Sequence, residues 1–106
     1  NKSNNNIYMY KLENGKMTKI PHIETNYELI EAFGDHFVCW DENISKYGVI
    51  DKEGSTILDA VYDEIKYVTD DGYIVYGSNG IYGVKDINGK TIIKPQYDDI
   101  YVYYKE

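Results

Sequence analysis

Two residues have the types and spacing of half a zinc site. His36 and Cys39 form a His-x-x-Cys pair, but a structural zinc site needs four ligands, and Cys39 is the only cysteine. The second histidine, His22, lies well upstream. Residues three apart on a strand point to opposite faces, which also disfavours a Cys–His nucleophile pair. We therefore expect Cys39 to be a small buried apolar residue, and we predict no metal site and no cofactor.

Three acidic pairs invite comparison with calcium loops and with glycosidases. They are Asp41-Glu42, Asp70-Asp71 and Asp98-Asp99. A calcium loop places several oxygens at alternating positions, as in Asp-x-Asp-x-Asp-Gly, which is missing from the sequence. Glycosidases need two carboxylates that face each other across a cleft, and a chain of short repeats offers little cleft. We interpret the pairs as solvated turns and predict that the protein is not an enzyme.

Aromatic side chains form the one candidate binding surface. The chain has 13 tyrosines, and strand alternation over residues 100–104 places Tyr101 and Tyr103 on one face. Trp40 and Tyr76 are predicted to occupy equivalent places in successive repeats. If exposed, such rings could stack on sugar rings or on a partner protein. The alternative is cross-strand packing within the sheet.

Charge and hydropathy exclude two classes of partner. The formal net charge is −7, and all 11 basic residues are lysines. Nucleic-acid recognition needs a basic footprint and draws heavily on arginine, so we predict no nucleic-acid partner. The longest uncharged apolar runs are about four or five residues, far shorter than the roughly 20 that a spanning helix requires. We therefore predict no membrane insertion.

The strands that carry these residues belong to an internal sequence repeat, which is typical of repeat architectures. Residues 46–65 and 81–100 agree at an offset of 35 residues. The pairs that define the motif are Tyr47 and Tyr82, Gly48 and Gly83, Asp51 and Asp86, Gly54 and Gly89, Tyr62 and Tyr97, and Asp63 and Asp98.

A degenerate third copy lies at the N-terminus. Residues 26–30 resemble residues 61–65, and Pro21 and Pro95 each stand six residues after a glycine. The opening residues are polar and favour a flexible leader. We divide the chain into a leader, residues 1–6, and a single β domain, residues 7–106, with repeats at residues 7–45, 46–80 and 81–106.

Each repeat predicts a β-hairpin. Residues 51–54 and 86–89 are typical of a type I turn closed by a glycine in the left-handed region, and residues 77–80 of a plain hairpin turn. The best helical stretch, residues 28–33, is cut short by Gly34. The expected strands cover residues 47–51, 55–58, 65–68, 73–76, 82–86, 90–93 and 100–104.

Strand parity predicts which side chains face inward. Tyr47 and Val49 recur as Tyr82 and Val84, and we place all four inward. Their neighbour Ile50 is replaced by a lysine in the next copy, so we expect the opposite face to be solvated in at least one copy.

Two strand glycines, Gly48 and Gly83, call for a reason, because glycine weakens a strand. We expect a neighbouring backbone or ring to lie across each of them.

The whole motif resembles the WG repeat family of bacterial proteins. Residues 82–100 carry Tyr-Gly-Val-x-Asp-x-x-Gly-x-x-Ile-Ile-x-Pro-x-Tyr-Asp-x-Ile almost completely, and residues 47–65 carry it with Ala60 in place of the proline. Both copies have tyrosine where the family name implies tryptophan. The resemblance implies a β-strand array used as a binding or structural module, often in secreted or lipid-anchored proteins. It supplies no catalytic residues.

We therefore expect an all-β array of about three stacked hairpin repeats. Its expected function is protein–protein interaction or structural display within a larger bacterial protein that is secreted or held at the cell envelope. The alternative is carbohydrate or cell-wall binding through Trp40, Tyr76, Tyr101 and Tyr103.

Overall fold

The computed structural model describes residues 9–21, 23 and 25–103, and this part of the chain consists of ten β-strands joined by turns. The predicted leader, residues 1–6, and His22 lie outside the described residues. The all-β class and the array of stacked hairpins are confirmed. Within the described residues, no helix has the length and apolar character needed to cross a bilayer.

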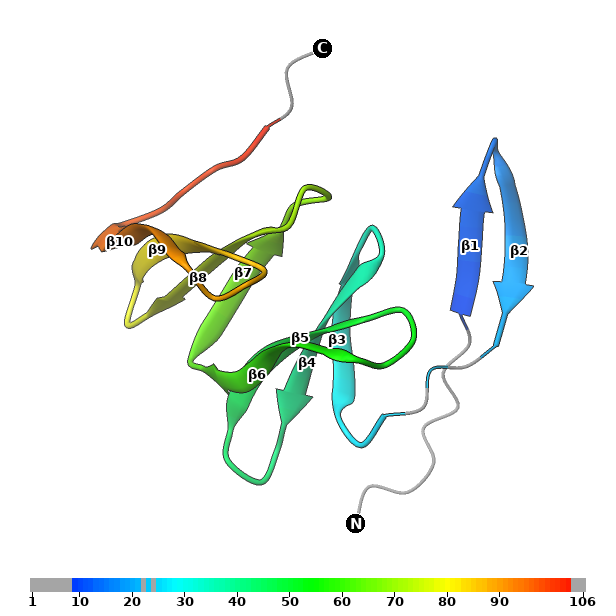
Figure 1. Ribbon diagram of the computed structural model, residues 1–106, viewed down its shortest axis with the longest axis horizontal. Helices are drawn as coiled ribbons and strands as arrows, with labels where there is room; N and C mark the ends of the chain where they lie inside the picture. The colour runs from blue at the N-terminus through cyan, green and yellow to red at the C-terminus, as the bar shows by residue number, and fades with distance from the viewer. Residues whose placement is uncertain (1–8, 22, 24, 104–106) are drawn as a thin grey trace.

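The strands form one two-stranded and two four-stranded antiparallel sheets, which follow one another along the molecule (Figure 1). The two-stranded hairpin consists of β1 (Met9–Glu13) and β2 (Lys16–Ile20). Sheet I consists, in order, of β3 (Glu28–Phe33), β4 (His36–Asp41), β5 (Lys46–Asp51) and β6 (Thr56–Tyr62). Sheet II consists, in order, of β7 (Glu64–Val68), β8 (Tyr73–Ser78), β9 (Ile81–Asp86) and β10 (Thr91–Tyr97).

The two motif turns have the same conformation, as the repeat predicted. Gly54 and Gly89 both lie in the left-handed region, with φ of +89° and +85°. The N–H of each glycine donates to the backbone carbonyl of Asp51 or Asp86 at 3.0 Å. The carboxylate of each aspartate also accepts two backbone N–H groups of its turn at 2.9 Å. Local sequence therefore dictates these bends in both repeats.

Two-residue turns close three other hairpins. Asn14-Gly15 and Asn79-Gly80 both have positive φ at each position, which is the type I′ geometry that suits the twist of paired strands. Gly34 (φ +61°) reverses the chain after residues 28–33, the best helical stretch of the sequence. This stretch forms strand β3, because its backbone pairs with β4 along its length. Tertiary pairing overrides a weak local preference here.

The sheets are out of phase with the sequence repeat. The predicted boundaries after residues 45 and 80 fall between β4 and β5 and between β8 and β9, which are neighbours within one sheet. The repeat at residues 46–80 therefore supplies the last two strands of sheet I and the first two of sheet II. In the sequence repeat, residues 100–103 correspond to residues 65–68 of β7.

The predicted strand over residues 100–104 is wrong for the residues that the structure describes. Residues 100–103 form no strand, and Tyr104 lies outside the described residues. A strand needs a neighbour to receive its backbone hydrogen bonds, and β7 has β8 as that neighbour. No described strand pairs with residues 100–103.

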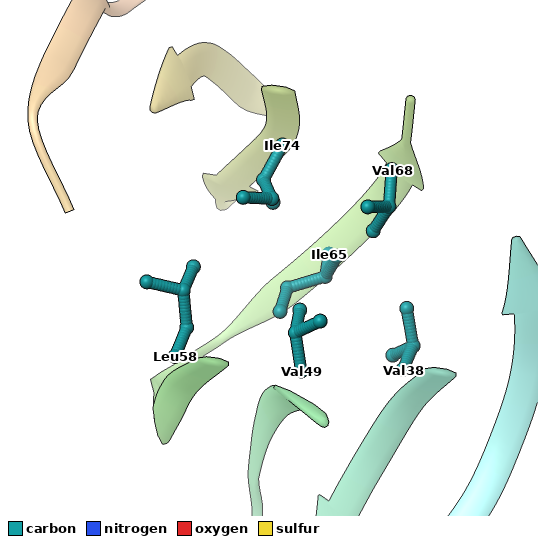
Figure 2. Close-up of a cluster of buried hydrophobic side chains, with 6 residues drawn as sticks. All are labelled: Val38, Val49, Leu58, Ile65, Val68 and Ile74. Carbon is teal, nitrogen blue, oxygen red and sulfur yellow. The ribbon is translucent and has the colours of Figure 1, made fainter. Parts of the chain in front are cut away.

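The main core lies between the two four-stranded sheets. Side chains of β4, β5 and β6 point toward side chains of β7 and β8 (Figure 2). The buried members are Val38, Val49, Leu58, Ile65, Val68 and Ile74. Burial of such aliphatic side chains is the main force that holds sheet I to sheet II.

A second core lies on the other face of sheet I. It joins Met9 and Ile23 to Phe37, Cys39 and Ile50, and Ile20 of the hairpin packs against it. In sheet I this face is covered, since Ile50 is only 1% exposed, whereas the equivalent Lys85 of sheet II is half-buried. The hairpin and the segment that follows it cover this face.

On the other face of β5 and β9, the prediction that the side chains point inward is confirmed for Val49 and Val84. Val49 and Val84 are buried, whereas Tyr47 and Tyr82 are half-buried. A tyrosine in this position keeps its ring against the sheet and its hydroxyl near water.

Candidate functional site

The recurrent glycines Gly48 and Gly83 lie beneath the backbone of the next strand, as predicted. A Cβ on Gly48 would stand 2.7 Å from the carbonyl oxygen of Leu58 and 2.9 Å from Cα of Ala60. A Cβ on Gly83 would collide with the carbonyl oxygen of Ile93 and stand 2.7 Å from the nitrogen of Pro95. The motif glycines are thus architectural, because a β-bulge in the next strand crosses over each one.

The motif tyrosines face each other across strands. Tyr62 lies opposite Tyr47, and Tyr97 lies opposite Tyr82. Such cross-strand aromatic pairs stabilise a sheet.

The motif aspartate Asp63 ties sheet I to sheet II. Its carboxylate accepts hydrogen bonds from Lys46 Nζ and Ser78 Oγ. These bonds, led by the one from Lys46, lower the pKa of Asp63 below its ordinary value of 3.8. The equivalent carboxylate, Asp98, makes no hydrogen bond or ion pair with the described residues.

A lysine lies between two tyrosines at the junction of the sheets. Lys85 Nζ donates to the Tyr62 hydroxyl oxygen at 3.0 Å and lies 4.9 Å and 5.2 Å from the ring centroids of Tyr62 and Tyr76. The two rings meet edge to face at 5.5 Å. The hydrogen bond to Tyr62 raises the pKa of Lys85 above its ordinary value. This cluster is an internal contact that closes the edge of the main core.

A second lysine joins the tail to sheet II. Lys66 Nζ lies 4.7 Å from the ring centroid of Tyr101 and 5.4 Å from that of Tyr82, and it forms an ion pair with Asp99. The Tyr82 hydroxyl donates to Glu64 Oε2 at 2.8 Å, and this bond raises the pKa of Tyr82. Cation–π contacts at such exposed sites contribute about 0.5–1 kcal/mol each.

Trp40 and Tyr76, expected to be equivalent, occupy different places. Trp40 lies opposite Tyr47, and their ring centroids are 4.5 Å apart. Tyr76 lies opposite Gly83, just as Cys39 lies opposite Gly48 in sheet I. Tyr76 is therefore the equivalent of Cys39 and not of Trp40. A shift of one residue reverses the face of a strand, so the two rings face opposite ways in their sheets. Both are half-buried and engaged in contacts within the chain.

Tyr101 and Tyr103 are the exposed members of the predicted surface. Their side chains are 83% and 86% exposed. The structure thus separates the four candidate residues, with two exposed after β10 and two half-buried within the sheets. The sequence analysis missed Lys66 and Lys85, which contact two of these rings, Tyr101 and Tyr76. The signal for Lys85 was its replacement of an isoleucine within an otherwise matched motif.

Cys39 is a buried apolar residue, as expected. It is 1% exposed, and burial raises the pKa of its thiol to about 11, although backbone hydrogen bonds from Gly48 and from its own residue act against this. Such a thiol is a poor nucleophile. Cys39 packs in the core beside Phe37, whereas His36 lies on the other parity of β4. Among residues 9–21, 23 and 25–103, no three His, Cys, Asp or Glu side chains gather as metal ligands would.

A recess at one end of sheet I offers mainly polar groups. Its volume is about 450 Å³, and it is lined by Thr25, Asn26, Tyr27, Asp41, Asn43 and Gly54. Among the described residues of the lining, Asp41 is the only carboxylate, and it accepts the backbone N–H of Asn43 at 3.0 Å.

Comparison with protein families identifies the repeat. A family model described as WG containing repeat matches residues 47–80 and 82–106. The curated proteins and the solved structures compared with the chain gave no match.

Proposed function

Because the chain belongs to the WG containing repeat family, we propose that it is a non-enzymatic module that binds other proteins. The observation that supports this most is the set of exposed apolar side chains on the outer strands and after β10. Its members on these elements include Tyr10, Leu12, Met17, Val61, Ile92, Tyr97 and Val102. Leu12 and Met17 lie opposite each other on the hairpin, and adjacent exposed apolar side chains of this kind are typical of interaction surfaces.

The composition of these surfaces favours a protein partner over a sugar. Most of the exposed groups are aliphatic or methionine side chains, which fill complementary apolar pockets. Sugars are usually held by flat rings with polar groups beside them. Of the four aromatic residues predicted to bind, Trp40 and Tyr76 already use their rings in contacts within the chain.

The cellular setting that we propose is the bacterial cell envelope or the extracellular space, as part of a larger protein. The resemblance to a family often found in secreted and anchored proteins supports this setting. The acidic charge of −7 favours solubility and disfavours anionic membrane surfaces.

Site-specific photo-crosslinking in the source cells tests the proposed function. A photoreactive phenylalanine replaces Tyr103 or Leu12, and the control carries it at the exposed Asp59 of β6. We expect discrete crosslinked proteins at the two test positions and none at the control. If all three positions yield the same weak background, the proposed function is wrong.

A second candidate function is carbohydrate binding at Tyr101. Its exposed ring stands beside the ammonium of Lys66 and the carboxylate of Asp99, and a ring with polar neighbours is suited to stacking on a sugar. Retention on bacterial cell-wall material checks this candidate. We expect Tyr101→Ala to abolish retention and Tyr73→Ala, a change at a partly exposed tyrosine of β8, to preserve it. Equal retention of the two variants would remove this candidate.

A further inference from the structure

The outer strands of both four-stranded sheets are irregular. The pairings of β3, β6, β7 and β10 with their neighbours all contain register shifts. The inner pairings, β4 with β5 and β8 with β9, contain none. Bulges on outer strands, and prolines such as Pro95 of β10, prevent another chain from adding to the sheet. Sheets I and II are therefore protected along both edges.

The β1–β2 hairpin lacks this protection. Its pairing is regular from Met9–Ile20 to Glu13–Lys16. On the face away from sheet I, Leu12 and Met17 lie opposite each other and are 68% and 60% exposed. A two-stranded sheet is marginal in water and gains stability from a third strand. The outer edge of β1 carries a single lysine, Lys11, whereas β2 carries Lys16 and Lys19, so β1 is the more open edge.

Residues 100–103 have the complementary property. They follow the Tyr97-Asp98 motif as β7 follows Tyr62-Asp63, and their sequence alternates like a strand, yet no described strand pairs with them. Three of their side chains are exposed, with Val102 at 39% and both tyrosines above 80%, and Ile100 is half-buried. Sheet I and the other strands of sheet II stand between β10, at the outer edge of sheet II, and the β1–β2 hairpin (Figure 1), which favours pairing between two molecules over pairing within one.

The charges of the two segments also match. The hairpin carries three lysines and one glutamate in an otherwise acidic chain, and Asp98 and Asp99 precede the tail. Asp99 already binds Lys66, but Asp98 makes no ion pair with the described residues. Opposite charge on two surfaces speeds encounter and sets orientation.

From these observations we propose that residues 100–103 of one copy add as a third strand to the outer edge of β1 in a second copy. The interface deepens the proposed function, on which it rests, by naming a second copy of this chain as a partner. It joins different surfaces of the two molecules, so it extends head to tail instead of closing as a symmetric dimer. Backbone hydrogen bonds supply the affinity, and the alternating side chains supply the register.

Sedimentation velocity of the full chain over a range of concentrations tests the interface. We expect the average mass to rise with concentration and to fall with added salt, because salt screens the lysine–aspartate attraction. Val102→Pro removes a backbone donor outside the sheets and should weaken association by about tenfold or more. Val102→Ala keeps that donor and is the matched control. A single-chain mass at every concentration, or equal association of Val102→Pro and the wild type, overturns the proposal.

Disulfide trapping gives an independent readout. Leu12→Cys chains mixed with Tyr103→Cys chains should form a mixed disulfide, and Asp59→Cys in place of Tyr103→Cys should not. The native Cys39 is buried with a pKa of about 11 and contributes little background. Equal trapping with both partners contradicts the interface. If the protein is purely monomeric, the self-association interface is wrong, but binding to other proteins is still tested by the crosslinking experiment in cells. The failure of the interface and the failure of the proposed function can therefore be told apart.

Discussion

Sheets I and II share their strand order, their motif turns and their glycines, yet they differ in what covers their faces. At the position directly before the motif turn, sheet I has Ile50 and sheet II has Lys85. Ile50 lies in the core beneath the β1–β2 hairpin. Lys85 lies between Tyr62 of sheet I and Tyr76 of its own sheet.

This difference shows that the repeat fixes the backbone, while the position in the array fixes the polarity of the faces. An isoleucine is buried where a neighbour covers the strand completely. A lysine is tolerated where its stem packs on rings and its ammonium reaches a hydroxyl or water. The two sheets therefore have one backbone design and two kinds of interface.

The largest expected effect distinguishes these two positions directly. Ile50→Ala should lower the free energy of unfolding by about 3 kcal/mol, because it leaves a cavity in a closed core. Lys85→Ala should cost about 1 kcal/mol or less, because the position is only half-buried. Urea denaturation of both variants measures the difference. Similar losses would mean that the two faces are covered alike.

The glycines test what the sheets have in common. Gly48→Ala and Gly83→Ala should each destabilise the protein by about 2 kcal/mol or more, since the new Cβ meets backbone atoms that cannot rotate away. Thr56→Ala, at an exposed position of β6, is the control. Thermal unfolding of the three variants provides the comparison. If either glycine variant matches the control, the close approach of strands is not required there.

The motif aspartates should show a smaller and equal effect. Asp51→Ala and Asp86→Ala each remove a carboxylate that accepts two backbone N–H groups, at a cost of about 1 kcal/mol. Asn at either position keeps an acceptor and should restore most of the loss. Denaturation midpoints check this, and a strong asymmetry between the two turns would contradict their equivalence.

The smallest expected effect is a loss of stability at alkaline pH. It comes from sheet II and from its junction with sheet I. The pKa of Tyr82 is raised above 10.0 by its bond to Glu64, and that of Lys85 above 10.5 by its bond to Tyr62. A group whose pKa is higher when folded stabilises the protein below its unfolded pKa and loses that contribution as pH rises through the folded value. Stability should therefore fall above about pH 10.

Tyr82→Phe separates this contribution from general alkaline unfolding. The variant should show a shallower decline of melting temperature than the wild type above pH 10, because it has no phenol to ionise. Tyr10→Phe, at an exposed position of β1, is the matched control. Identical declines in all three proteins would show that the Tyr82–Glu64 bond does not contribute.

Sequence reasoning succeeded where structure is local. The turns at residues 51–54 and 86–89, the close approach over Gly48 and Gly83, and the burial of Cys39 all followed from residue type and spacing. It predicted no strand over residues 28–33, which form β3, and it predicted a strand that the described residues 100–103 do not form. In both segments, strand formation depends on whether a partner strand is present. No residue within a segment encodes the presence of that partner.

The candidate surface was predictable only in part. Alternation within residues 100–103 indicated the tyrosines that prove to be exposed. The equivalence of Trp40 and Tyr76 failed because β4 and β8 stand in different registers with their partners. Turn lengths on either side of a strand set that register, and a difference of one residue reverses its faces.

The repeat, the bends and the all-β class follow from residue types and their order, because glycine, aspartate and asparagine restrict the backbone within a few residues of where they stand. Contacts between the sheets set which faces are covered, where one sheet ends and the next begins, and which edges of the described strands remain open. Those outcomes depend on contacts between segments far apart in the chain, and side-chain type alone does not specify the neighbour that a strand will meet.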